Sequence, residues 1–140
     1  METVRRESAR IALVDGRGRV LLLHAVLPGE EWWELPGGGV EPSEMHRDAA
    51  LRELVEETGI SVEDVELLGA VDTEFEFDGR WYHQRETVLR ADHPGTGVEL
   101  RNPDPPSFPR HVEYRWWEPL ELRATAEHIH PPQLAELLGV

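Results

Sequence analysis

The chain has 140 residues, with 28 acidic and 14 basic side chains and a formal net charge of −14 at pH 7. So acidic a chain repels polyanions, and we do not expect it to bind long nucleic acid or an anionic membrane through charge. It has no cysteine, which excludes disulfides and thiol chemistry. The length suits one domain over residues 1–140 with a substantial core.

The first ten residues are rich in charge and do not form an apolar leader. The sequence also has no stretch that is long and apolar enough to span a bilayer. From these two observations we expect a cytoplasmic protein without a membrane partner.

Two apolar runs near the N-terminus predict a β-hairpin. They cover 8–15 and 19–24 and flank a glycine-containing turn at 16–18. A loop at 25–31 separates this hairpin from the next ordered segment.

An α-helix is predicted between Ser43, a favoured N-cap residue, and Gly59, which suits the position after a helix C-terminus. At about 100° per residue, one side of this helix is apolar and fit for a core: Ala50, Leu51, Leu54, Val55 and Thr58. The other side gathers, within roughly 140°, Arg52, Glu53, Glu56 and Glu57.

Carboxylates crowded on one helical stripe repel each other by a few tenths of a kcal/mol per pair. One interpretation is an acidic helix face that is simply solvated. The other is a site in which Arg52 neutralises one carboxylate and a hard divalent cation, which takes oxygen ligands, neutralises the others.

The segment after the helix predicts a pair of strands. Residues 65–77 alternate between apolar and acidic side chains over their second half, as in a half-buried strand with an acidic outer face. Asp78-Gly79 is a hairpin turn signal, and residues 80–91 are the expected partner strand.

The C-terminal part begins with a long loop at 92–110, marked by several prolines and glycines, and either a functional lid or merely a mobile segment. A last strand is expected at 111–117. A short helix is then expected from about Pro131, carrying Leu134, Leu137 and Leu138 inward.

The spacing of the charges on the predicted helix favours a metal site over a simply solvated acidic face. The stretch from Gly38 to Ile60 resembles the Nudix hydrolase signature G-x5-E-x7-R-E-U-x-E-E-x-G-U, in which U is a bulky aliphatic residue. Every specified position matches without a gap: Gly38, Glu44, Arg52, Glu53, Leu54, Glu56, Glu57, Gly59 and Ile60. The segments 32–37 and 113–122 are also similar to parts that flank this signature in the family.

This resemblance implies an α+β fold of the Nudix type, an α/β/α sandwich in which a mixed β-sheet lies between helices. It also implies metal-dependent hydrolysis of a pyrophosphate bond in a nucleoside diphosphate derivative, with water attacking phosphorus. By elimination among subfamily marks, a nucleoside triphosphate or a nucleotide sugar is the favoured small-molecule substrate. The alternative is a non-catalytic Nudix domain that senses nucleotides or mediates an interaction.

The resemblance assigns roles to individual residues. Glu56 and Glu57 are expected to bind Mg²⁺ or Mn²⁺, with Glu53 as a further ligand or the general base and the backbone carbonyl of Gly37 completing the shell. Arg52 is expected to hold Glu53 or Glu56 in place. Two further residues are named: Glu44 as a structural tie between loop and helix, and Glu113, favoured over Glu99, as a later general base.

Substrate contacts are expected from three places. Trp32 and Trp33 are adjacent on an extended segment, so they point to opposite faces, and Trp32 is the candidate for stacking on a base. His24 is a rim residue or a ligand contact. Arg85 either pairs with the acidic strand or touches a substrate phosphate.

The oligomeric state stays open in the sequence. Dimers are frequent in Nudix proteins, and the aromatic residues Trp81 and Trp117 are candidates for a homodimer interface or for the core.

Overall fold

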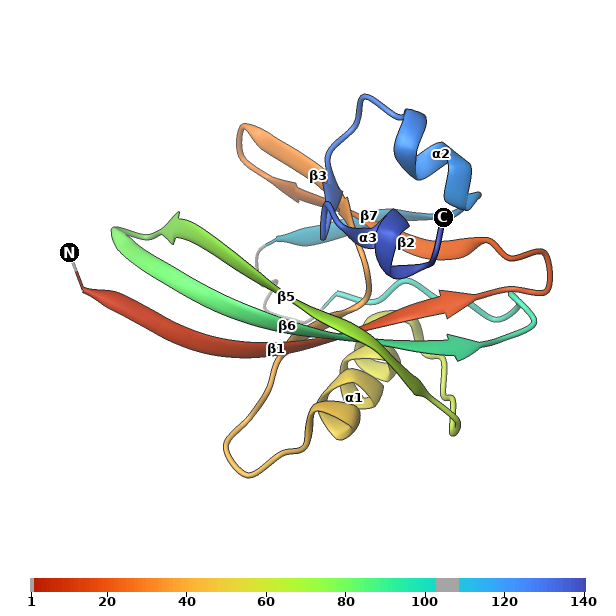
Figure 1. The fold of residues 1–140 in the computed structure, drawn as a ribbon, viewed down its shortest axis with the longest axis horizontal. Helices are drawn as coiled ribbons and strands as arrows, with labels where there is room; N and C mark the ends of the chain where they lie inside the picture. Colours follow the sequence, from red (N-terminus) through yellow and green to blue (C-terminus); the bar gives the residue numbers. More distant parts are fainter. Residues whose placement is uncertain (1, 103–108) are drawn as a thin grey trace.

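A computed structural model describes residues 2–102 and 109–140 of the chain. Its centre is one strongly curved, mixed β-sheet (Figure 1). The strands are β1 (Thr3–Val14), β2 (Val20–Leu27), β3 (Glu30–Glu34), β4 (Gly37–Gly39), β5 (Glu66–Phe77), β6 (Arg80–Asp92), β7 (Arg110–Trp117) and β8 (Ile129–His130). β1 runs parallel to β6 and β3 parallel to β8, and the other pairs are antiparallel.

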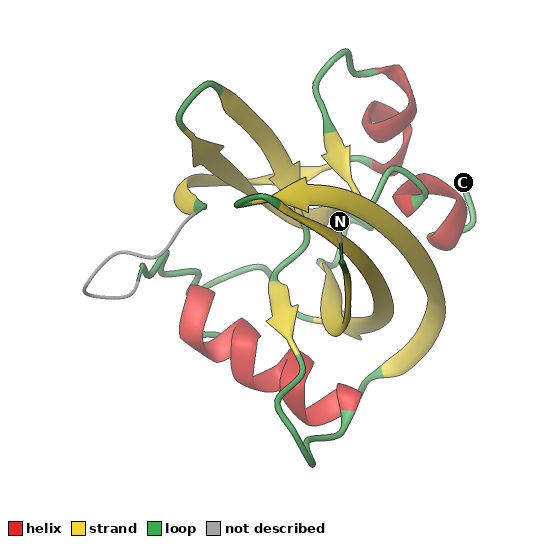
Figure 2. Ribbon diagram, turned by 90° about the vertical axis from the view of Figure 1, so that its left-hand side faces the viewer, coloured by secondary structure: helices red, strands yellow, loops and turns green. Residues whose placement is uncertain are grey.

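Helices cover both faces of this sheet. α1 (His46–Thr58) lies on one face, while α2 (Pro119–Ala124) and α3 (Leu134–Leu137) lie on the other (Figure 1). In Figure 2 the sheet bends strongly between α1 and the two short helices. This arrangement confirms the predicted α+β class with a mixed sheet between helices.

Strict alternation along β1 and β2 builds a core on each face of the sheet. Ile11, Leu13, Leu21 and Leu23 point to the core under α1, which includes Leu54 of that helix. The residues between them point to the other core, under α3: Ala12, Val20 and Leu22, together with Trp33, Trp117 and Leu134. A strand covered on both faces is expected to read as a continuous apolar run, as these two do.

The predicted N-terminal hairpin exists only at its turn. β1 and β2 meet at Val14 and Val20, where the Asp15 carboxylate accepts hydrogen bonds from the backbone N–H groups of Arg17 and Arg19. Beyond the turn the strands separate, and β1 pairs with β6 over its whole length. The hairpin prediction was therefore wrong in extent, because pairing partners far along the chain compete with the neighbouring strand.

α1 begins later than predicted. Its N-cap is Met45, and Ser43 lies outside the helix with a φ of 68°, so the prediction of Ser43 as the cap was wrong. The turn before the helix is closed instead by the Glu44 side chain, which accepts the N–H of Glu41. Gly59 caps the other end with a φ of 73°, and its N–H donates to the Val55 carbonyl, as predicted.

The apolar face of α1 is mostly as expected. Ala50, Leu54 and Thr58 are buried, but the predicted core residue Val55 is 37% exposed. The core takes Ala49 in its place.

The second half of the chain largely follows the predictions. On β5, Val71 is buried while its acidic neighbours are exposed, and the turn to β6 uses Asp78 and Gly79 with positive φ. Of the predicted loop at 92–110, residues 103–108 lie outside the described residues. Within the part that is described, no helix is long and apolar enough to cross a membrane.

Trp117 and α3 both contribute to the core. Trp117 is buried at 1% exposure and belongs to the core, so it offers no dimer surface. α3 buries Leu134 and packs Leu137 and Leu138 against the same core, as predicted. α2 and the short strands β4 and β8 were not predicted.

Candidate active site

The short strand β4 runs along α1 and brings backbone against the helical charges. The N–H of Gly37 donates to Oε1 of Glu57 at 2.7 Å. A Cβ added at Gly38 would lie 2.7 Å from the Glu53 carboxyl group, and the Gly39 carbonyl accepts a hydrogen bond from Arg52 at 3.1 Å. Gly38 is therefore required by the close approach of this strand to the helix.

The position of Gly37 against β1 also requires a glycine. Its φ is 152°, and an added Cβ would lie 2.3 Å from the Ala9 carbonyl oxygen on β1, which is backbone and cannot move aside. The strand is thus clamped between β1 and α1.

Arg52 organises the exposed side of the carboxylate cluster. Its guanidinium donates to both oxygens of Glu44, at 2.9 and 3.0 Å, to Glu53 at 3.0 Å, and weakly to Glu56 at 3.4 Å. Hydrogen bonds from Arg52 and from the backbone of Glu41 lower the pKa of Glu44 to about 2. Burial raises the pKa of Glu53, with repulsion from Glu56 adding to it and the nearby Arg52 opposing it.

Glu57 occupies the buried side of the same cluster. Burial raises its pKa well above the ordinary value, and the negative charge of Glu34 adds to the effect. Beside it lies His111, whose Nδ1 is 3.5 Å from Oε2 of Glu57 and whose Nε2 is 2.8 Å from Oε2 of Glu34. Ligand atoms of these three residues all lie within 4.8 Å of one another.

The Glu34 carboxylate is ionised despite its burial. Burial alone would raise its pKa, but the charge of Arg10 and the hydrogen bonds from His111 and Trp32 lower the pKa to about 2. Glu34 therefore supplies a permanent negative charge next to Glu57.

A buried ionic network continues from this cluster into the sheet. Arg10 on β1 contacts Glu86 on β6 at 2.8 Å and donates to the Leu35 carbonyl at 2.8 Å. Glu86 is fully buried and also contacts His130 at 2.8 Å and Gln84 at 3.0 Å. This network anchors β3, β6 and β8 behind the candidate site.

Two of the predicted substrate contacts line the same small pocket. His24 and Trp32 border a cavity of about 210 Å³, together with Trp33 and the segment 126–128. His24 stacks on the buried Trp33 at 4.6 Å between ring centroids, and Trp32 donates its indole N–H to Glu34 at 2.7 Å. Trp33 is buried, whereas Trp32 is partly exposed. Trp32 thus links this pocket to the Glu34–His111–Glu57 cluster.

The two later carboxylates predicted as bases are exposed and contact other side chains. Glu113 is exposed on β7 and pairs across the strands with His24, with 3.9 Å between Nδ1 of His24 and Oε1 of Glu113. The backbone N–H of Glu99 donates to the Thr58 carbonyl, but its side chain is exposed and lies 3.7 Å from Arg101.

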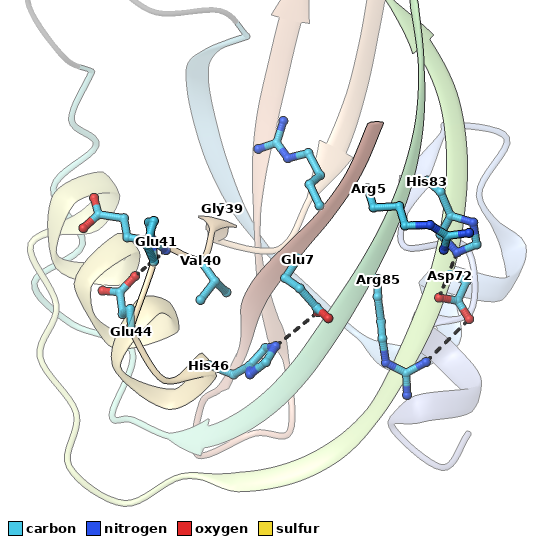
Figure 3. Close-up of a pocket in the computed structure, with 12 residues that line it drawn as sticks. Arg5, Glu7, Gly39, Val40, Glu41, Glu44, His46, Asp72, His83 and Arg85 are labelled. Atoms are coloured by element: carbon cyan, nitrogen blue, oxygen red, sulfur yellow. Dashed lines mark hydrogen bonds and ion pairs between the residues drawn. The ribbon is translucent and has the colours of Figure 1, made fainter. Parts of the chain in front are cut away.

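Arg85 lies in a different place, an open groove of about 810 Å³ at the N-terminal end of α1 (Figure 3). It lies 3.7 Å from Asp72 of β5, which confirms the predicted pairing with the acidic strand. The groove is also bordered by Arg5 and Arg6, by His83, and by His46, which contacts Glu7 at 3.2 Å.

Sequence reasoning missed Glu34 and His111. Glu34 lies in the segment before the glycine run, and His111 is the second residue of β7, so neither shares a local pattern with the helix. No local signal marked either residue, because much of β3 and β7 is exposed and only the tertiary structure shows that Glu34 and His111 are buried.

The donor set of the cluster fits a divalent cation. Glu53 and Glu57 lie against β4, and burial raises the pKa of Glu57, with the negative charges of Glu34 and Glu53 adding to the effect. Carboxylate oxygens and imidazole nitrogen are ordinary ligands for such ions.

Comparison with known proteins places this geometry in a family. The NUDIX domain family matches residues 4–137, nearly the whole chain. The chain belongs to the Nudix family. As a member of this family of hydrolases it is an enzyme, and the family prediction from the sequence is confirmed.

Similar proteins include an RNA pyrophosphohydrolase of Dinoroseobacter shibae, 34% identical over 128 residues, with 81% of this chain and 77% of that protein covered. An RNA pyrophosphohydrolase of Teredinibacter turnerae is 33% identical, with 82% and 74% covered. The crystal structure of a MutT NUDIX hydrolase from Burkholderia pseudomallei, 29% identical, superimposes with a TM-score of 0.74 over 94% of this chain and 95% of that chain.

Proposed function

We propose that this Nudix hydrolase cleaves a pyrophosphate bond in the 5′-triphosphate of a nucleotide or of a short RNA end, with water attacking phosphorus. The observation that carries the proposal is the set of carboxylates on α1, in which Glu57 and Glu53 lie against the backbone of Gly37 and Gly38 and Glu56 is held by Arg52. The geometry suits a polyanionic substrate only if cations offset the carboxylates.

The residues that would hold such a cation are Glu56 and Glu57, with Glu53 and the carbonyl of Gly37 as further ligands. When bound, Mg²⁺ or Mn²⁺ neutralises phosphate oxygens and lowers the pKa of a bound water. Arg52 acts as a positioning residue, because its hydrogen bonds to Glu44 and Glu53 set the direction of the Glu53 carboxylate.

Glu53 is our candidate for the general base. It is the partly buried carboxylate among the α1 ligands that Arg52 orients directly, at 3.0 Å. A base works only within hydrogen-bond reach of the attacking water, and Glu113 and Glu99 contact His24 and Arg101 instead. We expect Glu53→Gln to lower kcat far more than Glu113→Gln does.

Two kinds of evidence bear on the substrate. The relatives named RNA pyrophosphohydrolase support a 5′-triphosphorylated RNA end. The net charge of −14 favours a small partner, such as a free nucleoside triphosphate or a nucleotide sugar, over long RNA. A short RNA end satisfies both, because few phosphates need to approach the protein.

The pocket beside Trp32 and His24 is the proposed place for a base. Its volume of about 210 Å³ lies below the roughly 300–1,000 Å³ of pockets for whole drug-sized ligands. It therefore suits one ring system better than a complete nucleotide. We expect Trp32→Leu to raise KM, because stacking of a base on an aromatic side chain contributes about 1–3 kcal/mol.

The deciding experiment is a product-release assay with Mg²⁺ and with Mn²⁺. The substrates are a short RNA with a 5′-triphosphate, the four nucleoside triphosphates, an oxidised triphosphate, ADP-ribose, a nucleotide sugar and a dinucleoside polyphosphate. Release of pyrophosphate or phosphate that is lost in Glu57→Gln supports the proposal. Metal binding without hydrolysis of any member would contradict it and favour a nucleotide-sensing domain.

A further inference from the structure

His111 lies between the carboxylates of Glu34 and Glu57, which face different nitrogens of its ring. Its Nε2 is 2.8 Å from Oε2 of Glu34, and a carboxylate that is ionised can only accept a hydrogen bond. The Nε2 atom must therefore carry the hydrogen. In the neutral imidazole, Nδ1 then presents its lone pair toward Oε2 of Glu57, 3.5 Å away.

Oε2 of Glu57 faces that nitrogen and accepts no hydrogen bond within the described residues. Oε1 of Glu57 already accepts the N–H of Gly37 at 2.7 Å. His111 and Glu57 belong, with Glu34, to a group whose carboxylate and imidazole ligand atoms lie within 4.8 Å of one another, a spacing that suits ligands of one metal ion. Among the described residues, His111 itself is the only cationic or titratable basic side chain within 4.0 Å of the Glu57 carboxylate.

Arg10 does not fill this role. Its guanidinium contacts Glu86 and the Leu35 carbonyl, each at 2.8 Å, and Glu34 at 3.8 Å. Arg10 forms no ion pair with Glu57 among the described residues, although its charge partly opposes the burial that raises the pKa of Glu57.

We infer that Nδ1 of His111 and Oε2 of Glu57 are joint ligands of a divalent transition-metal ion, and that Glu34 is a positioning residue that fixes the ring of His111. The inference rests on the proposed function in that Glu57 is a metal ligand there. It adds an imidazole nitrogen to the carboxylate oxygens that α1 supplies.

The spacing of the two atoms suits such an ion. Bonds of about 2.1 Å to nitrogen and oxygen put two ligand atoms roughly 3.4 Å apart at a tetrahedral angle and roughly 3.0 Å apart at an octahedral right angle. The observed 3.5 Å is close to the first value.

Glu34 is not needed as a third ligand, because both of its oxygens are engaged. Oε1 accepts the indole N–H of Trp32 at 2.7 Å, and Oε2 accepts the ring N–H of His111 at 2.8 Å. A carboxylate that holds the far nitrogen of a metal-binding histidine fixes both its tautomer and its orientation.

The nitrogen ligand predicts metal selectivity. Imidazole suits Co²⁺, Ni²⁺ and Zn²⁺, whereas Mg²⁺ prefers oxygen ligands throughout. We expect the metal-free protein to bind Co²⁺ at least tenfold more tightly than Mg²⁺.

The test measures binding without substrate, so it does not depend on turnover. Titration calorimetry of metal-free protein with CoCl₂ and with MgCl₂ gives the affinity ratio for the wild type, His111→Gln, Glu34→Gln and the control His46→Gln. His111→Gln should weaken Co²⁺ binding by 10- to 100-fold with little change for Mg²⁺, and Glu34→Gln should weaken it by a similar factor. The control, at the exposed end of α1, should match the wild type.

A second readout needs no variant and so does not depend on variant folding. Pulsed electron paramagnetic resonance of the wild type loaded with Cu²⁺ should reveal coupling to an imidazole nitrogen. Bound metal without that coupling, or equal Co²⁺ affinity in the wild type and a folded His111→Gln, would overturn the inference and leave the proposed function standing. Failure of the wild type to bind any of these metals would overturn both.

Discussion

The two ends of α1 carry similar side chains in opposite environments. At the C-terminal end, Glu57 is buried beside Glu34 and His111, and the polar contacts continue inward through Arg10. At the N-terminal end, charged groups surround an open groove and form exposed ion pairs such as that of Arg85 with Asp72 (Figure 3).

Two glutamates of the same sequence signature show the consequence. Hydrogen bonds from Arg52 lower the pKa of Glu44 to about 2, whereas burial next to Glu34 raises the pKa of Glu57. A residue type therefore does not determine the chemistry of a carboxylate. The solvent it loses and the charge it faces on folding determine whether it is a stable anion or a group that attracts a cation.

The largest difference is expected between these two glutamates in catalysis. Glu57→Gln removes a metal ligand, and we expect kcat/KM to fall by roughly 10²- to 10⁴-fold, since a metal supplies several kcal/mol of charge stabilisation. Glu44→Gln disturbs the support of Arg52 and the turn at Glu41, and it should cost roughly tenfold. Pyrophosphate release measures both, with Glu136→Gln on α3 as an unaffected control. Equal losses at the two positions would remove the distinction between the ends.

Two arginines on β1 should contribute very differently to the free energy of unfolding. Arg10→Met leaves Glu86 and Glu34 buried without their cation, and we expect the free energy of unfolding to fall by about 3–5 kcal/mol. Arg5→Met, at the open groove, should change it by no more than about 0.5 kcal/mol. Urea denaturation followed by tryptophan fluorescence gives both values. A small effect at Arg10 would show that the buried network contributes little.

A third prediction uses the pH dependence of that network. Burial would raise the pKa of Glu86, but the contacts with His130 and Arg10 lower it from the ordinary 4.5 to about 2. The unfolded chain therefore binds the proton more readily. The stability that Glu86 contributes is complete above pH 4.5 and is lost as the pH falls from 4.5 toward 2.

That loss should be on the order of 3 kcal/mol. Urea midpoints at several pH values between 7 and 2.5 should show a steeper decline for the wild type than for Glu86→Gln, which does not titrate. Parallel curves for the two proteins would contradict the assignment of this carboxylate as an ion-pair partner.

The smallest effect is expected at the groove. Arg85 is more than half exposed and its charged atoms lie 3.7 Å from Asp72, so Arg85→Ala should change the free energy of unfolding by roughly 0–1 kcal/mol. KM for a 5′-triphosphorylated RNA, measured at low and at moderate salt, tests the other role considered for this residue. A salt-dependent rise in KM for Arg85→Ala would assign substrate phosphates to the groove and weaken the contrast between the two ends of α1.

The sequence by itself determined much of this protein. The spacing of Arg52, Glu53, Glu56 and Glu57 on a helix that ends at Gly59 is local, because i, i+3 and i, i+4 positions share a face whatever the surroundings. The alternation along β5 and the turn at Asp78 are local for the same reason. The family, the fold class and the helical part of the candidate site could therefore be read from residue order.

The tertiary structure alone decided how the site is completed. The β1–β2 hairpin gave way to a parallel pairing with β6, because strand partners compete across the whole chain. Glu34 and His111 come from strands far apart in sequence and meet Glu57 only when β3, β7 and α1 pack together. Their burial, which no local pattern reports, sets the charge that the site must balance.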